Sequence, residues 1–174
     1  MSNYYKINQY DTANGEGLRT TIFFTFCEFY CKDCFNKDIW ASDVGETFTR
    51  DVYENKIKPT INNYTAGISV LGGEPLHPRN IKAVSDLIDW FKKDFPNKNV
   101  WIWTGYTWEE LMERCRKGNE NDLNRLLCSI NVLVDGRFEL DKRDLTLKWR
   151  GSSNQRVIDV QETLKQGKIV LYCD

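Results

Sequence analysis

The chain has almost no net charge and no long apolar run, and these two absences exclude several classes of protein. It has 24 Lys and Arg residues against 25 Asp and Glu residues, for a formal net charge of −1. This balance is not typical of a protein that binds a nucleic-acid backbone or an anionic membrane. No stretch approaches the length of a membrane span, and residues 1–6 lack the apolar core of a secretory signal. We therefore expect a cytoplasmic protein with no nucleic-acid or membrane partner.

The chain also lacks internal repeats, low-complexity tracts and linkers. Its 174 residues are enough for one domain with a full hydrophobic core and too few for two comfortable ones. We therefore expect a single domain over residues 1–174.

What the chain does have is a cluster of three cysteines, Cys27, Cys31 and Cys34, with the spacing C-x-x-x-C-x-x-C. In a reducing cytoplasm, cysteines this close together more often bind metal than form disulfides. Three thiolates can hold three irons of a four-iron cluster and leave the fourth iron open to a small molecule. An open coordination position distinguishes a catalytic metal from a structural one. The other cysteines, Cys115, Cys128 and Cys173, stand singly and are expected to be small buried apolar residues.

Short apolar segments alternate with amphipathic segments along the chain. Strands are expected where β-branched and aromatic residues are frequent, at residues 18–26, 67–71, 100–104, 130–134, 156–160 and 169–172. Helices are expected at residues 80–95, from residue 107 onward, within residues 48–61 with a break near Pro59, and within residues 122–128. Asn80 is the expected N-cap of the first helix, and Thr107 with Glu110 forms a capping box.

This alternation predicts an α/β fold. Strands that alternate with helices indicate parallel βα units. Six candidate strands are too few for a closed eight-stranded barrel. The sequence therefore predicts either an incomplete, splayed barrel or an open parallel sheet.

Polar or glycine-rich residues follow four of the predicted strands. They are Cys27, Gly72-Gly73-Glu74-Pro75, Thr104-Gly105-Tyr106 and Asp135-Gly136, in chain order. In parallel α/β folds, functional residues collect in the loops at the carboxyl ends of the strands. A Gly-Gly pair lets the backbone approach a ligand closely, although by itself it is as often only a turn. We expect these four loops to form one site with the cysteines.

The cysteine spacing followed by Gly-Gly-Glu-Pro resembles the radical S-adenosylmethionine (radical SAM) enzymes. Further segments resemble the activating proteins of anaerobic ribonucleotide reductase, and together they cover nearly the whole chain. They are Asn14-Gly15-Glu16-Gly17-Leu18-Arg19-Thr20, Cys34-Phe35-Asn36, Trp103-Thr104-Gly105-Tyr106-Thr107, Val134-Asp135-Gly136 and Trp149-Arg150-Gly151-Ser152-Ser153-Asn154-Gln155-Arg156. The last segment is the most specific, because general radical SAM enzymes lack it.

The resemblance implies a partial parallel βα barrel of the radical SAM type, with a [4Fe-4S] cluster and SAM as cofactors. One electron from the reduced cluster cleaves SAM into methionine and a 5′-deoxyadenosyl radical. This radical takes a hydrogen atom from a glycine Cα of the reductase and leaves a glycyl radical there. The implied partners are the large subunit of anaerobic ribonucleotide reductase and an electron donor such as a flavodoxin or thioredoxin system.

The resemblance also implies roles for individual residues. Cys27, Cys31 and Cys34 bind iron. SAM is bound by Asp33, Cys34, Phe35, Gly72, Gly73, Glu74, Thr104 and Asp135. The partner is bound by Ser152, Ser153, Asn154, Gln155 and Arg156. From this assignment we expect Gly73→Ala to weaken SAM binding and to spare the cluster.

Some of these roles stay open on the sequence. Asp33 stands where many relatives carry the aromatic residue that packs on adenine, and Phe35 follows two positions later. Asp135 either binds a cation, helps to hold the SAM pocket, or is a loop carboxylate satisfied by its neighbours. Residues 152–156 either bind the partner or form a turn that only caps the sheet, since Ser and Asn often serve turns.

Three other functions are compatible with parts of this pattern. The three cysteines with His77, the only histidine, can form a structural Cys₃His zinc site. A radical SAM protein can instead activate another glycyl-radical enzyme or act on a small molecule, as a carboxy-deazaguanine synthase does. A non-catalytic iron-sulfur electron carrier would keep the cluster but would not need the Gly-Gly-Glu loop.

The cysteine assignment makes a direct prediction. Replacing Cys27, Cys31 or Cys34 with Ala should abolish a cluster of about four irons, because each thiolate holds one iron. The variants Cys115→Ala, Cys128→Ala and Cys173→Ala serve as controls and should keep the cluster. Iron content and charge-transfer absorption after anaerobic reconstitution measure the outcome, and full iron in a Cys27 variant would show that the ligand assignment is wrong.

Overall fold

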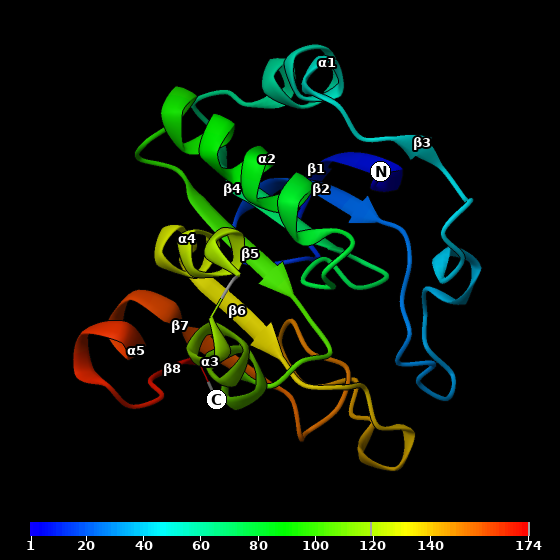
Figure 1. The fold of residues 1–174 in the computed structure, drawn as a ribbon, viewed down its shortest axis with the longest axis vertical. Helices are drawn as coiled ribbons and strands as arrows, with labels where there is room; N and C mark the ends of the chain where they lie inside the picture. The colour runs from blue at the N-terminus through cyan, green and yellow to red at the C-terminus, as the bar shows by residue number, and fades with distance from the viewer. Residues whose placement is uncertain (119, 174) are drawn as a thin grey trace.

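The fold is built on one mixed sheet. The computed structural model describes residues 1–118 and 120–173, and within them eight strands pair in the order β3-β1-β2-β4-β5-β6-β7-β8 (Figure 1). The central strands β2 (Leu18–Phe24), β4 (Thr65–Gly72), β5 (Asn99–Trp103) and β6 (Val132–Asp135) are parallel. The outer strands β1 (Asn3–Asp11), β3 (Glu46–Thr47), β7 (Arg156–Asp159) and β8 (Leu171–Cys173) pair antiparallel with their neighbours.

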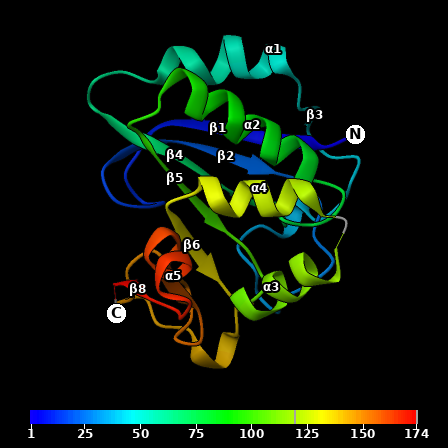
Figure 2. The same cartoon turned by 60° about the vertical axis from the view of Figure 1, so that its left-hand side comes forward.

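Helices cover one face of this sheet, and α2 and α4 lie side by side on it (Figure 2). The helices are α1 (Arg50–Val52), α2 (Ile81–Asp94), α3 (Trp108–Lys117), α4 (Asn121–Ser129) and α5 (Val160–Gln166). After α1 the chain continues into a π-helical turn, Tyr53–Ile57, and a 3₁₀ turn, Lys58–Thr60. None of the helices in the described part of the chain is long and apolar enough to cross a membrane.

The six predicted strands and four predicted helices are all present, with their ends shifted by a few residues. The capping box before α3 is confirmed, because Thr107 Oγ1 accepts from Glu110 N and Glu110 Oε2 accepts from Thr107 N. Asn80 is the N-cap residue of α2, as predicted, but its side chain makes no capping hydrogen bond. Its side-chain amide donates instead to the carbonyls of Thr25 at 2.8 Å and Glu74 at 3.0 Å, so it links the loops after β2 and β4.

Two strands and one α-helix were not predicted. β1 is mostly half-buried or exposed, so the strand lacks the alternating apolar pattern that identifies strands in a sequence. β3 has only two residues. α5 is short, and its first turn depends on Asp159, whose side chain accepts a hydrogen bond from Glu162 N at 3.0 Å.

The predicted parallel pairing is confirmed for the four central strands but does not extend to the outer strands. Parallel neighbours need long crossover connections, and the segments that carry α1, α2, and α3 with α4 supply them between the central strands. β1 reaches β2 through the short loop 12–17, and β6 reaches β7 through a loop without an α-helix. Such connections place consecutive strands antiparallel, so the sheet is mixed.

The main core lies between the sheet and the helices. The predicted apolar face of α2 is confirmed, because the apolar side chains that it buries are Ile81, Val84, Leu87, Ile88 and Phe91. They pack against fully buried strand residues such as Ile68 on β4 and Ile102 on β5. This layer fixes the positions of the four parallel strands and so of the loops that follow them.

The opposite face of the sheet is concave and carries a second, aromatic cluster. Trp101 on β5 packs with Val132, Val134 and Val157. The Trp101 ring lies 5.1 Å from the ring of Tyr172 on β8, although β6 and β7 separate these strands in the sheet. The Tyr172 hydroxyl is hydrogen-bonded to the carboxylate of Glu16, just before β2. The sheet therefore curls until its β8 edge reaches the loop before β2.

The core packing predicts a large effect for one side chain of α2. Phe91 is fully buried, so Phe91→Ala should lower the free energy of unfolding by about 3–5 kcal/mol. Lys93 is exposed on the same helix, and Lys93→Ala should change it by less than about 0.5 kcal/mol. Urea unfolding measures both, and equal effects would contradict this packing.

Candidate active site

The cysteine loop follows β2 at the carboxyl end of the parallel strands, together with the loops after β4, β5 and β6 (Figure 1). Its base is closed by a hydrogen bond from Cys27 N to Trp40 O at 3.1 Å. Phe26 and Tyr30 have φ values of 74° and 48°, in a left-handed conformation that is unfavourable for bulky side chains. The surrounding contacts therefore hold the loop in a shape that its own residues disfavour, and backbone of this kind is typical of functional sites.

Cys27, Cys31 and Cys34 line one pocket of about 150 Å³. The same pocket is lined by four of the predicted SAM-binding residues outside the cysteine loop, Gly72, Gly73, Glu74 and Thr104. The loops after β4 and β5 therefore meet the cysteine loop, as their shared position after parallel strands predicts.

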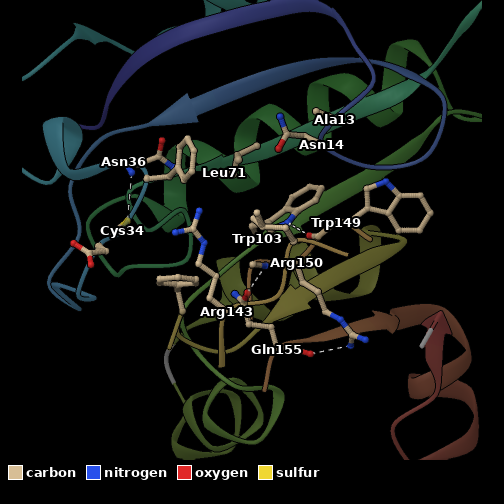
Figure 3. Close-up of a pocket in the computed structure, with 15 residues that line it drawn as sticks. Ala13, Asn14, Cys34, Asn36, Leu71, Trp103, Arg143, Trp149, Arg150 and Gln155 are labelled. Atoms are coloured by element: carbon tan, nitrogen blue, oxygen red, sulfur yellow. Dashed lines mark hydrogen bonds between the residues drawn. The ribbon is translucent and has the colours of Figure 1, made fainter. Parts of the chain in front are cut away.

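The thiols fit a multi-iron cluster better than a single ion. All six cysteines are free thiols. In the part of the chain that the structure describes, no three His, Cys, Asp or Glu side chains converge on one point as a single metal ion requires. A cluster needs only one thiolate per iron, and thiolate is the ligand that iron-sulfur clusters use. The Cys34 sulfur also accepts a hydrogen bond from Asn36 N at 3.4 Å (Figure 3), and such bonds tune clusters of this kind.

His77 takes part in other contacts, which argues against the Cys₃His zinc site. Its Nε2 lies 3.1 Å from a carboxylate oxygen of Glu28, and its Nδ1 accepts from Arg79 N at 3.0 Å. Its ring packs edge-on against Phe26 at 4.7 Å. Both ring nitrogens are therefore engaged with the protein.

Burial disfavours the thiolate form of two of the three thiols. It raises the pKa of Cys27 to about 11, and it raises the pKa of Cys31, with a further contribution from Cys34. Iron binds thiolates, so cluster assembly must displace these protons.

The Gly-Gly pair permits a close contact between two parts of the backbone, namely the β4 loop and the segment that follows β2. Gly72 has φ = +124°, and a Cβ there would lie 2.2 Å from the Phe24 carbonyl oxygen. A Cβ at Gly73 would lie 2.4 Å from the Phe26 carbonyl oxygen. That carbonyl accepts from Glu74 N at 2.7 Å. The pair therefore packs the β4 loop directly on the start of the cysteine loop.

The Glu74 side chain joins the β4 and β5 loops. It is buried, and its carboxylate accepts from Thr104 Oγ1 and Gly105 N at 2.7 Å each and from Leu76 N at 2.8 Å. Burial raises the pKa of Glu74 to about 7, against the opposing effect of these three hydrogen bonds. Glu74 and Thr104 therefore line the pocket as a hydrogen-bonded pair.

A larger cavity of about 610 Å³ adjoins this pocket and shares Cys34, Asn36, Leu71, Trp103, Phe138 and Gln155 with it. Trp103 and Trp149 form part of its wall, and Trp103 Nε1 donates to Trp149 O at 2.7 Å (Figure 3). Ala13 and Asn14 line it from the loop before β2. The volume lies in the range of small-molecule sites, so the two spaces together have room for a cofactor beside the thiols.

Asp33 and Phe35 line this larger cavity rather than the small pocket. The Asp33 carboxylate pairs with Lys37 Nζ at 3.2 Å. The Phe35 side chain is 95% exposed. Phe35 is thus an aromatic ring at the cavity that is free to pack on a ligand, and its role toward adenine stays a prediction.

Asp135 and Arg156, which were assigned separately to SAM and to the partner, bind each other. The buried Asp135 carboxylate accepts from Arg156 Nε at 3.0 Å, from Arg156 Nη2, and from Trp108 N at 2.7 Å. Arg156 also binds Glu109 through both terminal nitrogens, at 3.0 and 2.7 Å. These hydrogen bonds raise the pKa of Arg156. This network joins β6, β7 and the start of α3.

Residues 152–155 form a turn held by their own side chains. Gln155 Oε1 accepts from Gly151 N at 2.9 Å, and Gln155 Nε2 donates to Gly136 O at 2.9 Å. Asn154 Nδ2 donates to Arg137 O at 2.8 Å, and Ser152 is buried. Gln155 lines both spaces, whereas Ser153 is exposed. Partner binding by this segment stays a prediction.

Several residues at the site were not predicted. Asn36 donates through Nδ2 to Gly72 O at 3.1 Å, and the Phe29 side chain packs against Gly105 and Tyr106. Arg143 and Leu145 line the larger cavity from the loop between β6 and β7. Asn36 belongs to a segment that carries the family resemblance and was detectable there. The residues of the long loop have no local pattern that indicates a site.

The sequence model of the family described as "4Fe-4S single cluster domain" matches residues 13–158. This range contains the cysteine loop and every other loop of the small pocket. The α/β fold and the three thiols in one pocket, with this match, define the chain as an iron-sulfur cluster protein.

Curated relatives match over almost the whole chain and carry one name, anaerobic ribonucleoside-triphosphate reductase-activating protein. The protein from Vibrio cholerae is 38% identical over 88% of this chain and 95% of its own length. Those from Escherichia coli K12 and Enterobacteria phage T4 are 39% and 34% identical, each over 89% of this chain and over 97% and 92% of their own lengths. The chain belongs to the family of anaerobic ribonucleoside-triphosphate reductase-activating proteins, which confirms the resemblance seen in the sequence.

The packing of Gly73 changes the prediction for its substitution. A methyl group there would displace the Phe26 carbonyl, one residue before Cys27. Gly73→Ala should therefore lower the iron content after reconstitution as well as SAM binding. Gly167 is a matched control, because it has φ = +67° and nothing within 4 Å of its added Cβ. Gly167→Ala should cost only about 1 kcal/mol and keep full iron. Full iron in Gly73→Ala would contradict this account of the loop contact.

Proposed function

We propose that this protein activates an anaerobic ribonucleoside-triphosphate reductase by reductive cleavage of SAM at a [4Fe-4S] cluster. The observation that carries the proposal is the placement of Cys27, Cys31 and Cys34 in one pocket with the Gly-Gly-Glu loop. The names of the curated relatives support the same activity and the same protein substrate.

In this proposal the chain's residues hold and orient the cofactors. Cys27, Cys31 and Cys34 each bind one iron and leave the fourth iron open. The residues that would hold SAM are Gly73 and Thr104 in the small pocket and Phe35 at the larger cavity. When bound, the reduced cluster would supply one electron and SAM the carbon-sulfur bond that it breaks, so that methionine and a 5′-deoxyadenosyl radical able to take hydrogen from a glycine Cα of the reductase would result. The protein positions these groups and excludes water and other hydrogen donors.

We also propose that the curled sheet is a partial barrel of the radical SAM type in one domain over residues 1–174. Two features support this. The loops of the small pocket all follow the central parallel strands, as in α/β barrels. The aromatic cluster around Trp101 fills the concave face below the site, in the place of a barrel interior.

The larger cavity is the proposed entrance for the reductase. A glycine within a folded partner can meet the radical only if its loop enters the site. The cavity has a largely apolar wall, and two apolar side chains at it, Phe35 and Leu145, are 95% and 83% exposed. Exposed apolar residues beside a cavity are typical of contact surfaces. The proposed partner-binding segment is Ser152, Ser153, Asn154, Gln155 and Arg156, of which Gln155 lines this cavity.

The electron donor and the compartment complete the proposal. A small reductant such as a flavodoxin or thioredoxin system is the proposed source of the electron. The proposed location is the reducing cytoplasm, because all six cysteines are free thiols and such thiols persist in reducing compartments.

Anaerobic reconstitution with iron and sulfide, followed by two assays, tests the function. Dithionite-reduced protein should release 5′-deoxyadenosine from SAM. With the reductase present, the glycyl-radical EPR signal should form on the reductase. The Cys34→Ala variant should do neither, because it lacks one iron ligand.

Each alternative function gives a different result. A zinc protein would be colourless after reconstitution. An electron carrier would hold the cluster and release no 5′-deoxyadenosine. Cleavage of SAM without a glycyl radical on the reductase would identify a different substrate.

A further inference from the structure

A fully buried arginine lies on the concave face, against Trp101 and the loop before β2. Arg19 on β2 is 0% exposed, and its guanidinium lies 5.3 Å from the centre of the Trp101 ring. Its hydrogen-bond acceptors are all neutral: Ser69 Oγ at 2.7 Å, Ile68 O at 2.7 Å and Glu16 O at 3.0 Å. Within residues 1–118 and 120–173, no carboxylate forms an ion pair with it. Burial lowers its pKa to about 10, so it stays charged at neutral pH.

A buried charge without a counter-ion is costly unless its hydrogen bonds are well satisfied. Arginine offers several N–H donors in a rigid plane, and Arg19 directs them to three different acceptors. Two of these acceptors lead to the loop before β2. Arg19 Nη1 holds Glu16 O directly, and Arg19 Nε holds Ser69 Oγ, which in turn donates to Asn14 O at 2.6 Å.

The loop of residues 12–17 is fixed at other points as well. The Asp11 carboxylate accepts from Ala13 N at 2.7 Å, from Asn14 N at 3.2 Å and from Asn14 Nδ2 at 2.7 Å. The Glu16 carboxylate binds the Tyr172 hydroxyl. Ala13 and Asn14 form one side of the larger cavity, across from Gln155 (Figure 3). Arg19 does not line the cavity itself, but through Glu16 O and Ser69 it fixes the loop that forms one wall of the cavity.

We propose that Arg19, acting with Ser69, is a positioning residue for the protein substrate: it holds residues 13–17 as a rigid wall against which the glycine-bearing segment of the reductase lies. This inference rests on the proposed function. A wall fixed in advance lowers the entropy lost on binding, so its loosening should weaken recognition of the reductase more than it slows the reaction of the bound complex.

The test uses full-length reconstituted protein with Ser69→Ala and Arg19→Lys. Ser69→Ala removes the link to Asn14 O, and Arg19→Lys keeps the charge but loses the planar set of donors. Hydrogen exchange of the amides of residues 13–17 should accelerate several-fold in both. The KM for the reductase should rise about three- to tenfold, as loss of one hydrogen bond implies, and kcat at saturating reductase should change by less than about twofold.

Ser85→Ala is the matched control. Ser85 is also fully buried and accepts hydrogen bonds from an arginine, Arg125, at 3.0 and 3.2 Å, but it lies on α2 in the helical layer. Its variant should leave both the exchange of residues 13–17 and the KM for the reductase unchanged.

The outcomes separate this inference from the proposed function. Unchanged exchange in Ser69→Ala would overturn the positioning role, even if Arg19→Lys failed to fold. Faster exchange with an unchanged KM would show that the wall does not contact the reductase and would also overturn the inference. Failure of the wild-type protein to form a glycyl radical would instead refute the proposed function, and the exchange measurement would still report on the Arg19 link.

Discussion

The site depends on one backbone contact, between the Gly-Gly-Glu loop after β4 and the end of β2. Gly73 N donates to Phe24 O at 2.8 Å and Glu74 N donates to Phe26 O at 2.7 Å, with no room for a side chain at either glycine. This contact carries the parallel pairing of β2 and β4 past the end of the sheet and into the cysteine loop. Phe26 keeps its left-handed conformation because the neighbouring loop is packed against its backbone.

Buried polar side chains then join the remaining loops to this pair. Glu74 binds the β5 loop through Thr104 and Gly105, and Asn80 binds the carbonyls of Thr25 and Glu74. Asp135 performs the same function between β6 and the start of α3. Because a buried polar group left unpaired is costly, each of these bonds restricts the loops to one arrangement, and a site that orients cofactors needs such rigidity.

The two faces of the sheet serve different purposes. The face under α2 and α4 carries the main hydrophobic core, which stabilises the parallel strands. On the concave face, Trp101 packs against Trp149 and Tyr172, and the buried Arg19 lies over the Trp101 ring. Aromatic rings provide a large apolar surface that also tolerates a cation, so a charged residue can lie in this interior and bind the backbone of the loop before β2. Contacts on both faces of the sheet therefore fix the loops that form the site.

The sequence by itself determined the parallel βα units, the apolar face of α2, the capping box of α3, and the association of the cysteine loop with the loops after β4 and β5. These follow from local periodicity and from the rule that parallel strands end at one edge. The tertiary structure decided the antiparallel outer strands, the pairing of Asp135 with Arg156, the packing of Gly73 on Phe26, and the role of Arg19. Each of these depends on contacts between residues far apart in the chain, which no local pattern records.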